Sequence, residues 1–122
     1  MPKTILIADD EPDMADFLRT ALESEGFLVE SAASAEAIVA KLKTVTPDLI
    51  LLDMGMPGLN ATTPAQMIRD KTRTKAKILI MTGRDIDKEQ KEGHLKGSDG
   101  ALQKGAGMDL ILTKVKEAVG AA

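Results

Sequence analysis

Three short runs of aliphatic residues constrain the fold of this chain more than any other feature of its sequence. They are Ile5–Ala8, Leu49–Leu52 and Ile78–Met81, and none of them alternates with polar residues. Continuous runs of this kind are typical of strands buried on both faces, because a strand with one solvated face alternates apolar and polar positions. Phe27–Ser31 and Gly100–Gln103 predict two weaker strands. A sheet covered on both faces is therefore expected.

Segments with helical periodicity separate these strands. In the first, apolar residues that include Phe17 and Leu18 recur at spacings of three and four. Pro12 suits the first turn of that helix, Gly26 its C-terminal stop, and Ser34 the N-cap of the next helix. The expected helical segments are Met14–Leu22, Ala35–Leu42, Thr63–Lys71, the weakly amphipathic Asp85–Leu95, and Met108–Val119. Strands and helices that alternate in this way predict the α/β class, with a parallel sheet between two helical layers.

Composition excludes several kinds of site and bounds the domain count. The chain of 122 residues has room for one domain, residues 1–122, and no second one. It has no cysteine and a single histidine, His94, so disulfides, thiolate zinc sites and multi-histidine metal centres are excluded. Sixteen basic and nineteen acidic residues give a net charge of −3, which does not favour nucleic acid or a membrane surface as partner.

The N-terminal apolar run is too short for a signal peptide or a membrane span. A soluble protein of the cytoplasm is therefore expected. The alternating basic residues from Arg69 to Lys77 are expected to lie at a helix end and in the solvated loop that follows it, rather than to bind nucleic acid. His94, in a polar segment, is expected to be exposed to solvent.

Polar residues follow four of the five predicted strands. Asp9, Asp10 and Glu11 end the first strand, Asp53 the third and Thr82 the fourth, and Lys104 follows the fifth. In an open parallel sheet, chemistry gathers at the carboxyl ends of the strands. Taken singly, Asp53 could cap a turn and the acidic run could be a solvated helix start. The convergence of four strand ends favours a functional site.

Each of these residue types has a chemical use at such a site. Neighbouring carboxylates repel one another unless a cation lies between them, and an all-oxygen ligand set suits Mg²⁺. Asp53, on a rigid strand end, is a candidate carboxylate nucleophile toward phosphorus. Lys104 would neutralise charge on a transferring phosphoryl group, and the Thr82 hydroxyl would donate a hydrogen bond to it.

The chain resembles the receiver domain of two-component response regulators, and single-domain chemotaxis receivers are similar to it in length. The resemblance covers essentially the whole chain and rests on the order and spacing of its acidic pair, Asp, Thr and Lys. The matching segments are Ile5–Pro12, Pro47–Gly58, Ile78–Gly83 and Lys104. It implies a flavodoxin-like, doubly wound (βα)5 fold with the five-stranded parallel sheet in the order 2-1-3-4-5.

The resemblance also implies a role for each site residue. Asp53 would accept a phosphoryl group from the phosphohistidine of a sensor histidine kinase or a phosphotransfer protein. Asp10, Asp53 and the backbone carbonyl of Gly55 would hold Mg²⁺, with Asp9 acting through a metal-bound water. Thr82 and Lys104 would contact the phosphoryl oxygens, which makes the protein a self-phosphorylating receiver and not an enzyme in the usual sense. A stand-alone receiver without an output domain would then signal by binding a downstream protein through the face formed by its fourth helix, fifth strand and fifth helix.

Three positions depart from the family pattern. Ala101 stands where the family keeps an aromatic switch residue, and Gly105 replaces the proline that usually follows the lysine, so a cis peptide bond is not expected there. Ala61 replaces a glycine that is usual after Pro57. None of the three removes an atom from the chemistry, but Ala101 removes the usual mechanical readout.

Two other functions are considered beside phosphoryl acceptance. A receiver-like scaffold that binds a partner without being phosphorylated is favoured by Ala101 and Gly105. An aspartate-nucleophile phosphatase or phosphotransferase of the haloacid-dehalogenase kind would carry a D-x-D motif after its first strand, and Asp9-Asp10-Glu11 does not match it. Flavin binding is disfavoured, because the acids after the first strand would repel the flavin phosphate.

Overall fold

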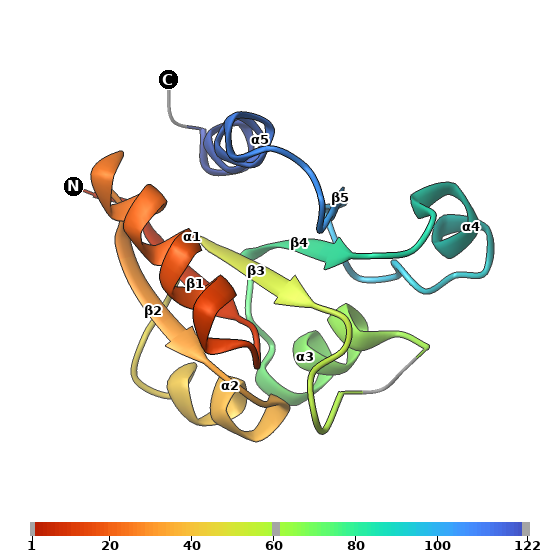
Figure 1. Cartoon of the computed structure of the whole chain (residues 1–122). Helices are drawn as coiled ribbons and strands as arrows, with labels where there is room; N and C mark the ends of the chain where they lie inside the picture. The colour runs from red at the N-terminus through yellow and green to blue at the C-terminus, as the bar shows by residue number, and fades with distance from the viewer. Residues whose placement is uncertain (1, 60–61, 121–122) are drawn as a thin grey trace.

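The computed structural model describes residues 2–59 and 62–120, and these form one parallel sheet with helices on both of its faces (Figure 1). The strand order is β2-β1-β3-β4-β5, as expected. The strands are β1 (Thr4–Ala8), β2 (Leu28–Ala32), β3 (Leu49–Asp53), β4 (Lys77–Thr82) and β5 (Gly100–Gln103). The helices are α1 (Pro12–Ser24), α2 (Ala35–Lys41), α3 (Pro64–Thr72), α4 (Ile86–Lys91) and α5 (Met108–Val119).

The central strands divide their side chains between two cores. Ile5 and Ile7 of β1 face a core that includes residues of α1 and α5, whereas Leu6 and Ala8 face a core that includes residues of α2 and α3. Strands β3 and β4 alternate in the same way. All five residues of β3 are buried. Burial on both faces is why these strands read as unbroken apolar runs in the sequence.

The predicted helix ends of α1, α2 and α3 are confirmed. Pro12 opens α1, and Gly26, at a φ of 91°, lies just beyond its C-cap. The Ser34 hydroxyl accepts a hydrogen bond from the Ala37 N–H and so caps α2. Pro64 opens α3. These local signals place the loops that carry polar residues at the carboxyl edge of the sheet.

Three sequence-based expectations are corrected by the structure. Helix α4 is shorter than predicted, ending at Lys91, because Gly93 and Gly97 adopt positive φ angles of 80° and 85° and turn the chain out of the helix. Phe17 is 58% exposed, because the buried stripe of α1 is centred on Leu18 and Leu22. His94 is not a solvent-exposed residue, since its side chain is 17% exposed and its Nδ1 contacts the buried carboxylate of Glu89.

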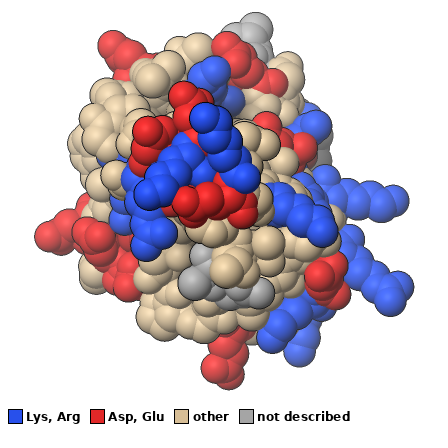
Figure 2. Space-filling model, turned by 90° about the vertical axis from the view of Figure 1, so that its right-hand side faces the viewer, with Lys and Arg blue, Asp and Glu red and all other residues tan. Residues whose placement is uncertain are grey.

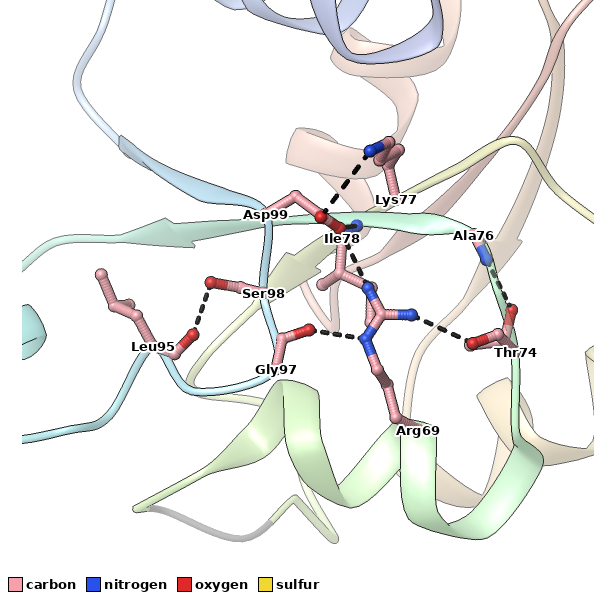
Figure 3. Close-up of polar contacts among 9 residues, drawn as sticks. All are labelled: Arg69, Thr74, Ala76, Lys77, Ile78, Leu95, Gly97, Ser98 and Asp99. Atoms are coloured by element: carbon pink, nitrogen blue, oxygen red, sulfur yellow. Dashed lines mark hydrogen bonds and ion pairs between the residues drawn. The ribbon is translucent and has the colours of Figure 1, made fainter.

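Arg69 of α3 holds the segment that leads into β5 (Figure 3). Its guanidinium donates to the carbonyls of Gly97 and Thr74, at 2.6 and 3.0 Å, and to Asp99 Oδ2 at 2.9 Å. Asp99 Oδ2 also accepts the Ile78 N–H at 2.9 Å. One half-buried guanidinium thereby joins α3 to the start of β4 and to the strand that ends beside the site.

Gly97, in the segment that leads into β5, packs closely against α3. A β-carbon added there would lie 2.8 Å from the backbone N and Cα of Gln66 in α3, and the residue has a positive φ of 85°. We expect Gly97→Ala to lower the free energy of unfolding by about 2–5 kcal/mol, from backbone strain and from the clash with α3. Urea denaturation measures the loss.

Gly93→Ala is the matched control, since Gly93 has a similar φ of 80° with open space around the position of the added atom. That variant should lose only the strain, about 1–2 kcal/mol. Equal losses in the two variants would contradict the close packing of Gly97 on α3.

Candidate functional site

The polar residues predicted at the strand ends converge at one edge of the sheet. Asp9 follows β1, Asp53 ends β3 and Thr82 ends β4, while Lys104 follows β5. Strands β1, β3, β4 and β5 are consecutive neighbours in the sheet, so their carboxyl ends lie in a row. The Lys104 N–H donates to the Thr82 carbonyl at 2.8 Å and joins two of these ends directly.

Three carboxylates form the acidic part of the site. Asp9, Asp10 and Asp53 each place a carboxylate oxygen within 4.8 Å of the other two. Asp9 and Asp53 are buried, whereas Asp10 is exposed. Asp9 Oδ1 also accepts the Glu11 N–H at 2.9 Å, which fixes its orientation at the start of α1.

Burial and charge crowding raise the pKa of Asp9 above its ordinary value. Desolvation is the largest cause, the Glu11 N–H opposes it, and the negative charge of Asp53 adds to it. A carboxylate in this position is more costly to ionise than one in water. The acidic part of the site therefore stores electrostatic repulsion that a cation would relieve.

Asp53 is held from two sides. Its Oδ1 accepts the Gly55 N–H at 3.0 Å, and its Oδ2 lies 3.2 Å from Lys104 Nζ. Lys104 Nζ also lies 3.5 Å from Glu11 Oε1. Burial acts to lower the pKa of Lys104, but the hydrogen bond and charge of Asp53, with the charges of Asp9 and Glu11, raise it overall. Lys104 is thus a permanent cation beside the buried carboxylate.

A pocket of about 530 Å³ opens beside Asp53. Thr82, Gly83, Arg84 and Lys104 form its polar wall. Met54 and Met56 line it as well, together with Leu59. The Thr82 hydroxyl accepts the Arg84 N–H at 3.0 Å and keeps its own proton to donate. The pocket has room for a group larger than a water molecule next to the carboxylate.

The donor set fits a hard divalent cation. All of the side-chain donors that converge here are carboxylate oxygens, which are the ligands that Mg²⁺ prefers, and the exposed Asp10 leaves one side open to water. Burial, with a smaller contribution from the charge of Asp53, raises the pKa of Asp9, so a cation bound here would offset the cost of its ionisation. Asp9, Asp10 and Asp53 are therefore the residues that would hold the ion.

Sequence reasoning missed two charged residues near the site. Arg84 lines the pocket, and its Nη1 lies 3.6 Å from Oε1 of Glu89, which is buried in α4. Glu89 also contacts His94, so a buried carboxylate with two side-chain partners lies beyond the end of β4. The pattern I-D-K-E-Q-K contains no signal for it, because a glutamate in a polar helix is normally solvated.

The three departures from the family pattern have different outcomes. Ala101 lies in β5, half-buried against the core that contains Leu95, and leaves no ring at that place. The peptide bond that precedes Gly105 is trans. Ala61 lies outside the described residues.

The raised pKa of Asp9 predicts a dependence of stability on pH. The folded protein binds the Asp9 proton more tightly than the unfolded chain does, so the charge of Asp9 destabilises the fold as pH rises from the ordinary value of 3.8 through the raised value. Without divalent cations, we expect Asp9→Asn to raise the free energy of unfolding at neutral pH. The gain should shrink as pH falls through the raised value toward 3.8 and should be absent below 3.8.

Denaturant titrations at several pH values test this expectation. Asp16→Asn, at an exposed position of α1, is the control and should show no such gain. An Asp9→Asn variant that is no more stable than the parent at neutral pH would contradict the crowding of the three carboxylates.

Comparison with known proteins gives a consistent set of relatives. The response regulator receiver domain family matches residues 5–116. The chain is 30% identical to the transcriptional regulatory protein ResD of Bacillus subtilis over 92% of its own length and 46% of that protein. It is 34% identical to YvrH of the same organism over 83% of its length and 42% of that protein. The chain therefore spans about half the length of these curated relatives.

Solved structures agree in fold. A putative response regulator from Chloroflexus aurantiacus superposes with a TM-score of 0.85 at 29% identity, covering 98% of this chain and 99% of that one. A CheY-like receiver domain protein from Methanospirillum hungatei gives 0.84 at 28% identity, covering 98% and 95%. No helix in residues 2–59 and 62–120 is long and apolar enough to cross a membrane. The fold, the convergent strand ends and the family match together show that this chain belongs to the response regulator receiver domains of two-component signalling.

Proposed function

We propose that Asp53 accepts a phosphoryl group, in a Mg²⁺-dependent reaction, from the phosphohistidine of a sensor histidine kinase or phosphotransfer protein. The observation that carries the proposal is the setting of Asp53. It is a buried carboxylate, held by the Gly55 N–H and Lys104 Nζ, that faces a pocket of about 530 Å³. A carboxylate held in this way is oriented for attack, and the pocket has room for the incoming group.

The transfer exchanges one bond to phosphorus for another. A carboxylate oxygen of Asp53 forms the P–O bond while the P–N bond to the donor histidine breaks, and its electron pair stays on the imidazole nitrogen. Lys104 Nζ, 3.2 Å from Asp53 Oδ2, is placed to move onto a phosphoryl oxygen. The Thr82 hydroxyl has its proton free to donate to a second phosphoryl oxygen. Mg²⁺ held by Asp9, Asp10 and Asp53, with the Gly55 carbonyl, would neutralise charge on the carboxylates and the phosphoryl oxygens.

The same pocket would admit water to the acyl phosphate. Autodephosphorylation by hydrolysis of the P–O bond is therefore part of the proposal, and it returns Asp53 to its starting state. The protein would act catalytically only on itself, as is expected of a signalling domain. We also propose a cytoplasmic location, where a kinase that draws its phosphate from ATP finds its substrate.

The proposed output surface is formed by α4, β5 and α5. The β4–α4 loop joins it to the site, because the Arg84 N–H is bonded to Thr82 Oγ1 and the Arg84 side chain reaches Glu89. Figure 2 shows the side of the molecule that carries α4, where basic and acidic side chains are intermixed. A downstream protein with a mixed polar surface is the partner that this face suits. Several relatives are called transcriptional regulatory proteins, which describes those proteins and leaves the partner of this chain open.

A receiver-like scaffold that works without phosphorylation is the alternative. Ala101 supports it, since the residue has no ring to report the state of Thr82. The two functions differ in whether Asp53 is modified.

The site assignment predicts the behaviour of Asp53→Asn. Wild-type protein with Mg²⁺ and acetyl phosphate should gain the mass of one phosphoryl group, because the Asp53 carboxylate is the nucleophile. Asp53→Asn should gain none, since the amide does not form an acyl phosphate. Intact-mass spectrometry measures both, and beryllofluoride binding gives a second readout that does not depend on turnover.

Asp109→Asn, at an exposed position in the first turn of α5, is the matched control and should be labelled like the wild type. Phosphoryl incorporation that persists in Asp53→Asn would refute the assignment. Wild-type protein that neither binds Mg²⁺ nor becomes labelled would favour the scaffold.

Substitution of Thr82 tests phosphoryl transfer and the response of the output surface separately. Thr82→Ala removes one hydrogen-bond donor to the phosphoryl group, so labelling should persist but slow by about 100- to 1,000-fold. Because Thr82 Oγ1 also holds the Arg84 N–H, the variant should lose the response of α4 to phosphorylation. Amide chemical shifts of α4 with and without beryllofluoride measure this response. Wild-type protein whose α4 shifts do not change on beryllofluoride binding would argue against a switch.

A further inference from the structure

A groove runs between α2 and α3, away from the phosphoryl-acceptor pocket. Three adjoining hollows of about 470, 150 and 720 Å³ make it up. The first two share Val39, Lys43 and Lys71, and the last two share Leu42 and Thr72. Figure 1 shows α2 and α3 side by side on one face of the sheet. The two smaller hollows therefore lie along α2 and α3, and the largest continues from them past the C-terminal ends of both helices to the amino edge of the sheet, where it reaches Ala118 and Val119 of α5.

The groove spans the distance between the two edges of the sheet. One end is lined by Gly58, in the loop that follows Asp53. The other end is lined by Asp48 and Lys77, at the amino ends of β3 and β4. None of the residues that line it also lines the pocket beside Asp53, so the two are separate.

The charge of the groove is opposite to that of the rest of the protein. Five basic residues line it, against the two acids Glu36 and Asp48; the basic residues are Lys43, Lys71, Arg73, Lys75 and Lys77. Elsewhere the chain has eleven basic and seventeen acidic residues. A concentrated positive groove on a negative protein favours an acidic ligand over a basic or neutral one.

Most of this positive charge has no internal partner. Lys43, Lys71 and Lys75 are exposed, and in the described part of the chain neither they nor Arg73 forms an ion pair. Arg69 shows the contrast, because all of its bonds go to its own fold (Figure 3). The groove cations are therefore available to a partner.

The floor of the groove is aliphatic. Val39, Leu42, Val45 and Met67 are half-buried there, so apolar surface remains to be covered. No aromatic side chain lines the groove, and the only two aromatic residues of the chain are Phe17 and Phe27. Nucleic-acid bases would find no ring to stack on. An aliphatic floor between basic walls matches an amphipathic peptide with apolar and acidic sides.

Arg73 provides a second, independent observation. It adopts a left-handed conformation with φ of 58°, the only non-glycine residue with positive φ in residues 2–59 and 62–120. It occupies the C-cap of α3, where glycine is the favoured residue because it carries no β-carbon. Arg69 and Lys71 already place basic side chains in the last turn. The arginine therefore occupies a position that local backbone preference disfavours, and there it lines the groove with positive charge.

We propose that the α2–α3 groove binds an acidic, amphipathic segment of a partner protein. Leucine-like side chains of the segment would cover Val39, Leu42 and Met67, and its carboxylates would pair with Lys71, Arg73 and Lys75. The proposal does not depend on phosphorylation of Asp53. A partner bound there would contact the loop that carries Gly58 and would leave the α4–β5–α5 face free.

The test uses a synthetic helical peptide of about 15 residues with leucine along one side and glutamate on its flanks. We expect it to bind the wild-type protein with a Kd below about 100 µM. Raising the salt from about 0.1 to about 1 M should weaken binding at least tenfold, because the Debye length falls from about 10 to about 3 Å. Fluorescence titration gives the affinity, and amide chemical shifts should change at α2 and α3.

Three variants locate the binding. The double variant Lys71→Glu and Lys75→Glu should bind at least tenfold more weakly, whereas Lys114→Glu, an exposed charge reversal on α5, should bind like the wild type. Arg73→Gly should weaken binding about threefold and should unfold at an equal or higher urea concentration, because it relieves the left-handed arginine. Asp53→Asn should bind unchanged, which keeps this test separate from that of phosphoryl acceptance.

Several results would overturn the proposal. One is equal weakening by Lys114→Glu and by the double reversal, since binding would then follow net charge alone. Another is tighter binding of a single-stranded oligonucleotide or an anionic vesicle than of the peptide, with the same variants affected. A third is a protein that self-associates in sedimentation and becomes monomeric on the double reversal, since a second copy would then occupy the groove. A lower free energy of unfolding in Arg73→Gly would show that the left-handed conformation of Arg73 carries no cost, which contradicts this part of the proposal.

Discussion

Burial of β1, β3 and β4 on both faces is the constraint on which the rest of this structure depends. Their side chains divide between two cores, so the strands must lie parallel in the middle of the sheet with helices above and below. Polar residues are then tolerated only where each strand leaves the core. That requirement places Asp9, Asp53 and Thr82 in a row at one edge. The ends of the strands position these residues, and no interaction among the three is needed.

The charges at that edge of the sheet are not balanced. Burial and the negative charge of Asp53 raise the cost of ionising Asp9, and Lys104 offsets only part of it. A divalent cation would stabilise such a site, and so would a group whose oxygens accept hydrogen bonds from both Lys104 and Thr82. Charge is distributed differently around α2 and α3, where unpaired lysines lie beside an aliphatic floor. The protein thus has two regions of uncompensated charge, of opposite sign, at different places on its surface.

Much of the fold was predictable because its signals are local. The apolar runs, Ser34 as N-cap and Pro12 in a first turn all act within a few residues, and each is found as expected. The failures involve long-range contacts. Phe17 fits the periodicity of α1 as well as Leu18 does, yet it is exposed because the sheet covers a narrower stripe. Helix α4 ends early at glycines whose positive φ angles the sequence pattern does not reveal, and His94 is shielded by its contact with Glu89.

The order of acidic pair, aspartate, threonine and lysine along the chain determined by itself which residues would meet at the site, because parallel strands bring their carboxyl ends to one edge. Only the tertiary structure decided how they meet. It gave Asp53 the Gly55 N–H on one oxygen and Lys104 on the other, and it packed Gly97 against α3. It also turned an unremarkable run of basic residues into the wall of a groove, with Arg69 drawn inward and Arg73 in a left-handed turn. The physical reason is range: periodicity and capping act between neighbours in sequence, whereas charge, burial and close packing depend on residues that only folding brings together.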